Sequence, residues 1–325
     1  MLSFFRTNQL LASSLFLLYA AVLHLSAWYV PSSWEPGAYG LFSDYVYGWI
    51  GYDTTAAHIL VILLVILHGI TVNVLDFSNK LSRDLTLFPG LFVILLSAFS
   101  PTFLHLAPQH LANTFLLFAT GSLMQVYRTS KVAIPLFNAG LHLGVAFMFL
   151  PAYWVFVFYL FFGLNVLRSF QFRERLMVLS GFFVVVFLSG TVYFLLERWP
   201  EFVDGQLRDL QVFVDFGRLP PMGWIHLGIL GVFLVIAIFR HNQIMQKRIM
   251  QAQKKIDLMY WMLLFGGISC FFQPSLNEAH ALVIVPALGM LTGMQFVNLE
   301  NRTAELMHFL LFLLALFLQF RVFFF

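Results

Sequence analysis

The chain has 325 residues, of which 60% are hydrophobic and only 10% are charged, whereas a soluble domain carries about 25% charged residues. This composition excludes an ordinary soluble protein and predicts a polytopic membrane protein with an all-α fold. The net charge of +3 fits the bias of membrane proteins towards basic cytoplasmic loops, so it does not indicate a nucleic-acid partner. The single cysteine, Cys270, excludes an internal disulfide and a Cys-rich metal cluster.

The amino end carries one basic residue, Arg6, before an apolar run that is longer than the core of a signal peptide. No small-x-small cleavage site separates this run from Trp28 and Tyr29, so we expect a retained first span. Further apolar segments recur near residues 57–75, 85–99, 110–126, 133–150, 152–167, 176–196, 223–239, 257–272, 279–297 and 305–323. The sequence therefore predicts one membrane domain over 1–325, a transmembrane helical bundle with about 11 spans.

Basic residues alternate between the two sides of this bundle when the amino end is placed inside. Only four then fall outside: Arg198, Arg208, Arg218 and Arg321. The rule that basic loops stay inside therefore predicts a cytoplasmic amino end and an external carboxyl end.

Two of the predicted outer loops, 29–56 and 197–222, are long enough to hold interfacial helices. In the first, apolar residues recur on one helical face and Asp44 falls on another. In the second, Val203 and Leu207 begin an apolar repeat among acidic residues, and the pair Pro220-Pro221 ends it.

The segment from Pro101 to Pro151 is a predicted membrane hairpin whose basic turn carries Arg128 and Lys131. The opposite face of this hairpin carries His105, His110 and Asn113. These groups could hold a phosphate or a metal, or they could hydrogen-bond neighbouring spans, because polar side chains at membrane depth need partners.

The remaining candidate residues are acidic residues, histidines and arginines at the predicted outer face. Asp44 could be a general base that takes a proton from an acceptor hydroxyl, or a solvated loop acid. Asp53, five residues before His58, is either a substrate-binding acid or a helix cap. Glu278 and His280 form a second polar pair, for which helix capping is the alternative. Arg208 and Arg218 are cations that could bind an anionic lipid headgroup.

Other histidines lie in or beside the predicted spans, which raises the idea of haem held by two helices. Haem needs paired ligands at matched depth, and the sequence shows no such pairing, so we predict no cofactor and assign no metal. No P-loop, no HExxH and no dinucleotide-binding glycine pattern occurs, which excludes most soluble enzyme classes. We expect Asp44, His110 and the segment 204–215 to meet around one outer cavity.

Two resemblances add to this interpretation. The runs NKLSRDLTLFPGLFVILL, SPTFLHLAPQHLANTFLLFA, PLFNAGLHLGVAFMFLPAYWVF and RSFQFRERL resemble an uncharacterised family of bacterial polytopic inner-membrane proteins. More distantly, the order of first span, structured outer loop and basic hairpin followed by FNAGLHLGVAFMFLP is similar to the GT-C glycosyltransferases. That resemblance implies a GT-C-like core, a polyprenyl-phosphate-linked sugar as donor and Asp44 as the base. Asp44 stands alone, whereas GT-C enzymes often carry a paired acidic motif there.

The resulting expectation is an inner-membrane protein of envelope biogenesis that transfers sugar from a polyprenyl-phosphate carrier at the outer face. The alternative is a non-enzymatic membrane component, either a lipid transporter or an assembly subunit that docks membrane-protein partners through its Phe-rich surface. Membrane lipids are partners under both interpretations.

Overall fold

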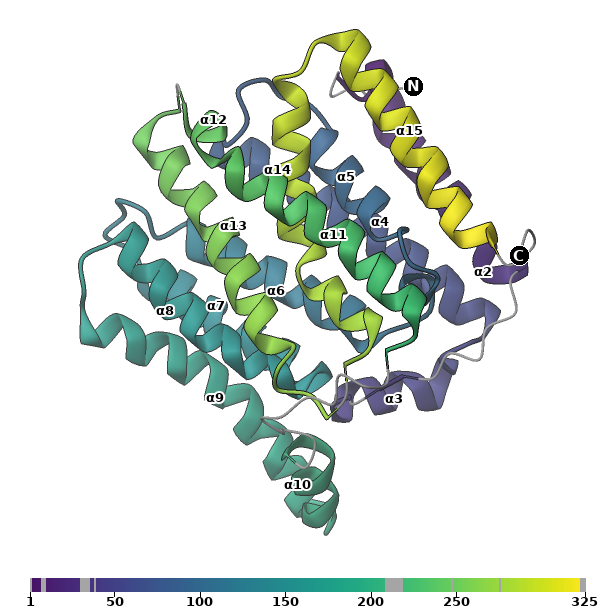
Figure 1. Ribbon diagram of the computed structural model, residues 1–325. Coiled ribbons are helices and arrows are strands. Elements are labelled where there is room, and N and C mark those ends of the chain that lie inside the picture. Colours follow the sequence, from purple (N-terminus) through teal and green to yellow (C-terminus); the bar gives the residue numbers. More distant parts are fainter. Residues whose placement is uncertain are drawn as a thin grey trace.

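The structure, a computed structural model, describes residues 2–6, 10–29, 36–37, 39–207, 219–246, 248–274 and 276–321. Within these ranges all regular secondary structure is helical, as the composition predicts (Figure 1). Most of the longer helices lie in the apolar segments of the sequence, because a hydrogen-bonded helix satisfies its own backbone in lipid.

The first part of the bundle runs to the end of α8. Its elements are η1 (Leu2–Arg6), α1 (Leu10–Leu23), α2 (Ser26–Tyr29), α3 (Leu41–Ile50), α4 (Thr55–Asn79), α5 (Phe88–Leu96), η2 (Pro101–Leu104), α6 (Pro108–Met124), α7 (Ala133–Phe149), η3 (Pro151–Val155) and α8 (Phe156–Leu167). The second part contains α9 (Phe172–Leu195), α10 (Trp199–Leu207), α11 (Pro221–Phe239), α12 (His241–Met245), α13 (Met250–Ser269), η5 (Glu278–Val283), α14 (Val285–Val297) and α15 (Asn301–Phe320).

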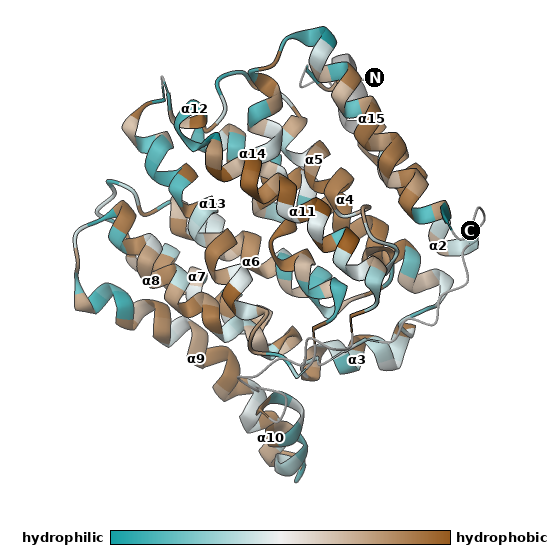
Figure 2. Cartoon of the chain, viewed as in Figure 1, coloured by the Kyte–Doolittle hydropathy of each residue, from teal (hydrophilic) through white to brown (hydrophobic). Residues whose placement is uncertain are grey.

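Four of the described helices are long and apolar enough to cross a membrane alone, namely α4, α9, α11 and α15. Several shorter apolar helices pack among them, and the count of 11 spans stays a prediction. Figure 2 shows hydrophobic residues along the lengths of the helices and hydrophilic residues near their ends, around α12 for example. This distribution supports a multi-pass membrane protein.

The two outer loops predicted to hold helices contain α3 and α10. In Figure 1 both lie at one end of the bundle, and α12 lies at the opposite end. Residues 208–218 of the second predicted outer loop, which include Arg208 and Arg218, fall outside the described residues. The position of α3 and α10 at a membrane interface stays a prediction.

The centre of the bundle is formed by α5 and α14, in which every residue is buried. α5 packs between α4 and α14. Glycines permit this close approach: Gly90 lies against the backbone of Gly69, and Gly293 lies against Pro89. The Gly90 amide also donates to the Asn73 side chain (2.8 Å). Small residues at such crossings let membrane helices gain packing contacts that lipid cannot supply.

A second glycine crossing joins α7 to α9. A methyl group added at Gly140 would collide with the carbonyl oxygen of Val178, and one added at Gly181 would collide with the carbonyl oxygen of Phe137. Both obstacles are backbone atoms, which cannot rotate away. This crossing therefore fixes the position of α9, and of α10 packed against it, relative to the hairpin of α6 and α7.

Replacing Gly140 by Ala should destabilise the protein by about 1 to 3 kcal/mol, because the helices must separate to admit the methyl group. The matched control is Gly228→Ala on α11, where an added methyl group meets nothing within 4 Å. The control should be neutral or slightly stabilising, since Ala favours a helix more than Gly. Thermal unfolding midpoints of the two variants in one detergent test this, and equal midpoints would contradict the assigned role of the crossing.

Candidate functional site

The helix α3 is fixed to three other parts of the bundle. The Ser43 hydroxyl donates to the carbonyl of Phe149 at the end of α7 (2.9 Å), and the Tyr47 hydroxyl donates to the carbonyl of Leu106, just before α6 (3.0 Å). Gln206 of α10 accepts from the Leu41 amide (3.3 Å). These buried hydrogen bonds hold the buried face of α3 in place.

Asp44 lies on the exposed face of this fixed helix. Among the described residues, its carboxylate makes no hydrogen bond and no ion pair, while the neighbouring Tyr45 hydroxyl accepts from Tyr193 of α9 (3.2 Å). A solvated carboxylate on an immobile helix can accept a proton from a bound hydroxyl without first breaking an internal contact.

A second polar cluster joins Asp53, His58 and His105. Asp53 Oδ1 lies 2.9 Å from His105 Nδ1 and 3.5 Å from His58 Nε2. The indole of Trp28 packs edge-on against the His58 ring, with centroids 5.4 Å apart. Both imidazoles are buried and the carboxylate is partly exposed, so this cluster is open on the side of Asp53.

The alternative role of Asp53 as a helix cap is wrong, because α4 is capped by its neighbour. The Thr54 hydroxyl accepts from the Ala57 amide (3.1 Å), as an N-cap side chain does. Asp53 is therefore free to face the two histidines instead.

The chemistry of this cluster depends on the protonation of its histidines. Burial lowers the pKa of His105, although the nearby Asp53 charge opposes that shift. A neutral imidazole keeps a lone pair, and the candidate donor atoms of Asp53, His58 and His105 all lie within 4.8 Å of one another. Two imidazoles and a carboxylate are donors that divalent zinc accepts. The cluster could hold such a cation, or it could bind a polar substrate group directly.

His110 and Asn113, which the sequence groups with His105, make separate contacts. His110 Nε2 lies 2.9 Å from the Phe103 carbonyl oxygen. The Asn113 amide donates to the Leu282 carbonyl (2.8 Å), and its oxygen accepts from the Tyr153 hydroxyl (2.7 Å). These buried bonds connect α6 to η2, η3 and η5, which agrees with the alternative of hydrogen bonding between spans.

Glu278 and His280 also separate, although they are two residues apart. His280 accepts from the Asn277 amide (3.3 Å) within a capping box. Glu278 Oε2 instead accepts from His226 Nδ1 of α11 (2.8 Å) and from the Ser100 hydroxyl (2.5 Å). Burial alone would raise the pKa of Glu278, but these hydrogen bonds outweigh it and hold the pKa below its ordinary value.

His226 and Ser100 complete this buried cluster, and sequence reasoning did not identify either as a partner of Glu278. Ser100 precedes η2, and His226 is one of several histidines spread over the apolar segments. Only the packing of η2 and α11 against η5 brings the three together. No local motif marks such a contact.

The predicted cation pair Arg208 and Arg218 lies outside the described residues. Of the predicted site residues, the structure brings together Asp53, His58 and His105. It ties His110, Asn113, Glu278 and His280 to internal partners, and it leaves Asp44 exposed. The shared outer cavity around Asp44 and His110 stays a prediction.

No protein-family model and no curated protein matches the chain. A solved structure does: the chain is similar to the crystal structure of ArnT from Cupriavidus metallidurans bound to undecaprenyl phosphate, with a TM-score of 0.53 and 15% identity. The match covers 87% of this chain and 56% of that chain, so the chain spans little more than half the length of ArnT. ArnT is a GT-C glycosyltransferase, and at this identity the likeness shows the fold. The chain therefore has a GT-C-like helical membrane fold.

Proposed function

We propose that the protein is a GT-C-like glycosyltransferase of the bacterial inner membrane. It acts in envelope biogenesis and takes a sugar from a polyprenyl-phosphate carrier at the outer face. The observation that carries this proposal is Asp44, an exposed carboxylate without an internal partner among the described residues, on the anchored helix α3. The likeness to ArnT bound to undecaprenyl phosphate supports the choice of carrier.

In the proposed reaction, Asp44 accepts the proton of the acceptor hydroxyl as its oxygen forms a bond to the anomeric carbon. The bond between that carbon and the carrier phosphate breaks, and polyprenyl phosphate leaves with the bonding electron pair. The leaving phosphate needs cationic partners, and Arg208 and Arg218 are the proposed ones. The cluster of Asp53, His58 and His105, at the other end of the loop that begins with α3, is the proposed contact for the polar part of a substrate.

The non-enzymatic alternative is a membrane component that binds lipid without turnover. One observation favours it: polar groups inside the bundle, such as Asn113 and Glu278, are used in internal hydrogen bonds. Under this alternative the protein would have the same helical fold but would not transfer sugar.

The two candidates differ in turnover. The purified protein in lipid nanodiscs would be given a panel of undecaprenyl-phosphate sugars, and released undecaprenyl phosphate would be measured by mass spectrometry. The enzyme should release it faster than empty nanodiscs for at least one sugar, since water can replace the natural acceptor. Saturable binding of the carrier with no release above that background would favour the non-enzymatic component.

A further inference from the structure

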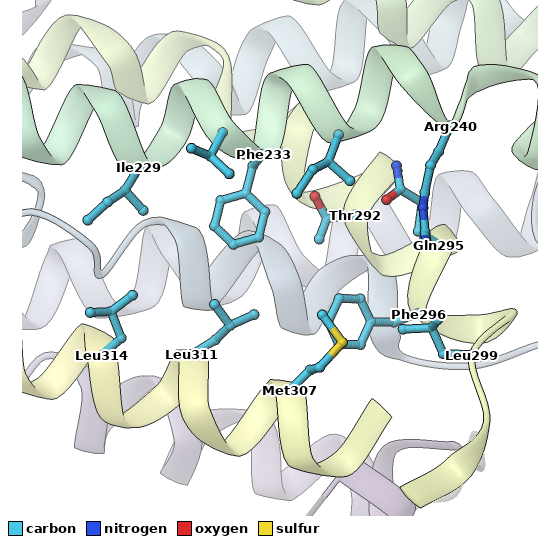
Figure 3. Close-up of a pocket in the computed structure, with 12 residues that line it drawn as sticks. Ile229, Phe233, Arg240, Thr292, Gln295, Phe296, Leu299, Met307, Leu311 and Leu314 are labelled. Carbon is cyan, nitrogen blue, oxygen red and sulfur yellow. The ribbon is translucent and has the colours of Figure 1, made fainter. Parts of the chain in front are cut away.

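A groove lies between α11, α14 and α15, at the periphery of the bundle (Figure 3). Its volume is about 430 Å³, within the range of roughly 300 to 1,000 Å³ typical of ligand pockets. The walls are apolar side chains, among them Phe233, Phe296 and Leu311. Val232 and Met307 on its margins are 58% and 43% exposed, so the groove is open along its side.

One end of this groove is polar. Figure 3 shows Arg240 and Gln295 close together at that end, and Ile229 and Leu314 at the other. Arg240 follows the last turn of α11 and is half-buried, and among the described residues it has no ion-pair partner. The nearby acid Asp257 lies beside His241 instead (3.5 Å).

Gln295 gives an independent indication of a ligand. Its side chain is only 6% exposed, it lines the groove, and its Nε2 atom has no hydrogen-bond partner among the described residues. Buried polar groups in native proteins are nearly always paired, so an unpaired donor beside an unpaired cation points to an acceptor from outside the chain. That acceptor must be negatively charged or strongly polar, and it must be joined to an apolar part that fills the groove.

We infer that this groove binds one anionic glycerophospholipid. The lipid phosphate accepts hydrogen bonds from Arg240, an ester or phosphate oxygen accepts from Gln295 Nε2, and one acyl chain lies along Phe233, Leu311 and Ile229. Basic pockets between membrane helices recognise anionic headgroups in this way. Two of the walls, α11 and α15, are long and apolar enough to cross a membrane, so the open side of the groove faces the lipid.

The position of the polar end favours a resident phospholipid over the proposed sugar carrier. Arg240 follows the carboxyl end of α11, whereas the amino end of the same helix lies at η5, next to Glu278. α11 is 19 residues long, or about 28 Å at 1.5 Å per residue. The groove headgroup therefore lies a membrane thickness away from the outer clusters, at the face predicted to be cytoplasmic, where anionic lipids are common.

The test is native mass spectrometry of the purified, delipidated protein, titrated with palmitoyl-oleoyl phosphatidylglycerol or with the matching phosphatidylcholine. The wild type should bind one phosphatidylglycerol in preference to phosphatidylcholine. Arg240→Gln should weaken that binding about tenfold or more, because a charge-assisted contact to the phosphate is lost. Arg302→Gln is the matched control: Arg302 is exposed, lies in the first turn of α15 and does not line the groove.

A second variant, Leu311→Trp, fills the groove and leaves the charge in place, and it should reduce binding of the same lipid. Equal loss in Arg240→Gln and Arg302→Gln would overturn the inference, as would unchanged binding in both groove variants. Preferential retention of undecaprenyl phosphate over phosphatidylglycerol would overturn it too. None of these results depends on turnover, so the inference and the proposed glycosyl transfer can fail separately.

Discussion

Asp44→Asn should lower the rate of sugar transfer by roughly 100-fold or more. The amide keeps the size of the side chain but cannot accept the hydroxyl proton. The helix itself should not move, because α3 is held through Ser43 and Tyr47 on its other face. We would measure release of undecaprenyl phosphate under single-turnover conditions, together with binding of the donor. Donor affinity should stay unchanged while the rate falls.

Two further variants make the Asp44 experiment decisive. Asp84→Asn changes an exposed acid in the segment between α4 and α5, and it should leave the rate unchanged. Asp53→Asn removes the carboxylate between His58 and His105 and should weaken donor or acceptor binding more than the chemical step. If Asp53→Asn abolishes turnover and Asp44→Asn does not, the base is Asp53 and the assignment of Asp44 is wrong.

Glu278→Ala should destabilise the folded protein by about 2 to 6 kcal/mol, because two buried hydrogen-bond donors lose their acceptor and each unsatisfied donor costs about 1 to 3 kcal/mol. The change leaves His226 and Ser100 buried without their shared acceptor, and it removes the hydrogen bonds that join η2 and α11 to η5. Chemical unfolding in a mixed detergent and SDS titration measures the loss. Glu201→Ala is the control, because Glu201 makes an exposed ion pair with Arg198 and should contribute little.

The same cluster predicts an acid-sensitive stability. The pKa of Glu278 is lowered in the folded state, so its contribution is fully present above the ordinary pKa of a glutamic acid. It is lost as the pH falls through the lowered value, when the carboxylate must take up a proton. Glu278→Gln should flatten this part of the pH profile. A profile that is identical in the wild type and in Glu278→Gln would contradict the assignment.

The sequence predicts the helices well because a long apolar run in a membrane must form its own backbone hydrogen bonds, and an α-helix does this within one segment. The hairpin of α6 and α7 around Arg128 and Lys131 follows from composition and charge alone. The helix α3 follows from the alternation of apolar and polar faces around Asp44. These features depend on residues close together in the chain, so periodicity is enough to find them.

The pairings within the candidate site depend on tertiary packing and could not be read from spacing. Sequence proximity groups His105 with His110, yet His105 contacts Asp53, which lies 52 positions earlier, while His110 contacts Phe103. Glu278 likewise contacts His226 and Ser100 instead of its neighbour His280. A polar side chain in an apolar segment predicts that a partner exists. It does not predict which helix supplies that partner.

The short central helix α5 shows a further limit of composition. The apolar segment 85–99 suggests a span, but the helix covers only Phe88–Leu96 and is buried on every side. Nine residues of α-helix extend about 13 Å, less than half of the roughly 30 Å hydrocarbon thickness. Hydropathy shows that a segment is buried away from water. It does not show whether the segment is surrounded by lipid or by other helices of the protein.

That burial also sets an order of events during synthesis. One wall around α5 is α14, and the ribosome completes α14 only after α6 to α13 have been made. At about 5 to 20 residues per second, α5 waits roughly 10 to 40 s for this neighbour. The side chains of α5 are wholly apolar, so nascent α5 can rest in lipid meanwhile without exposing a charged group. Val93 packs on Gly289 in the folded protein. A polar substitution at Val93 would therefore first disfavour the residence of nascent α5 in lipid, and only later disturb the packing of α5 on α14.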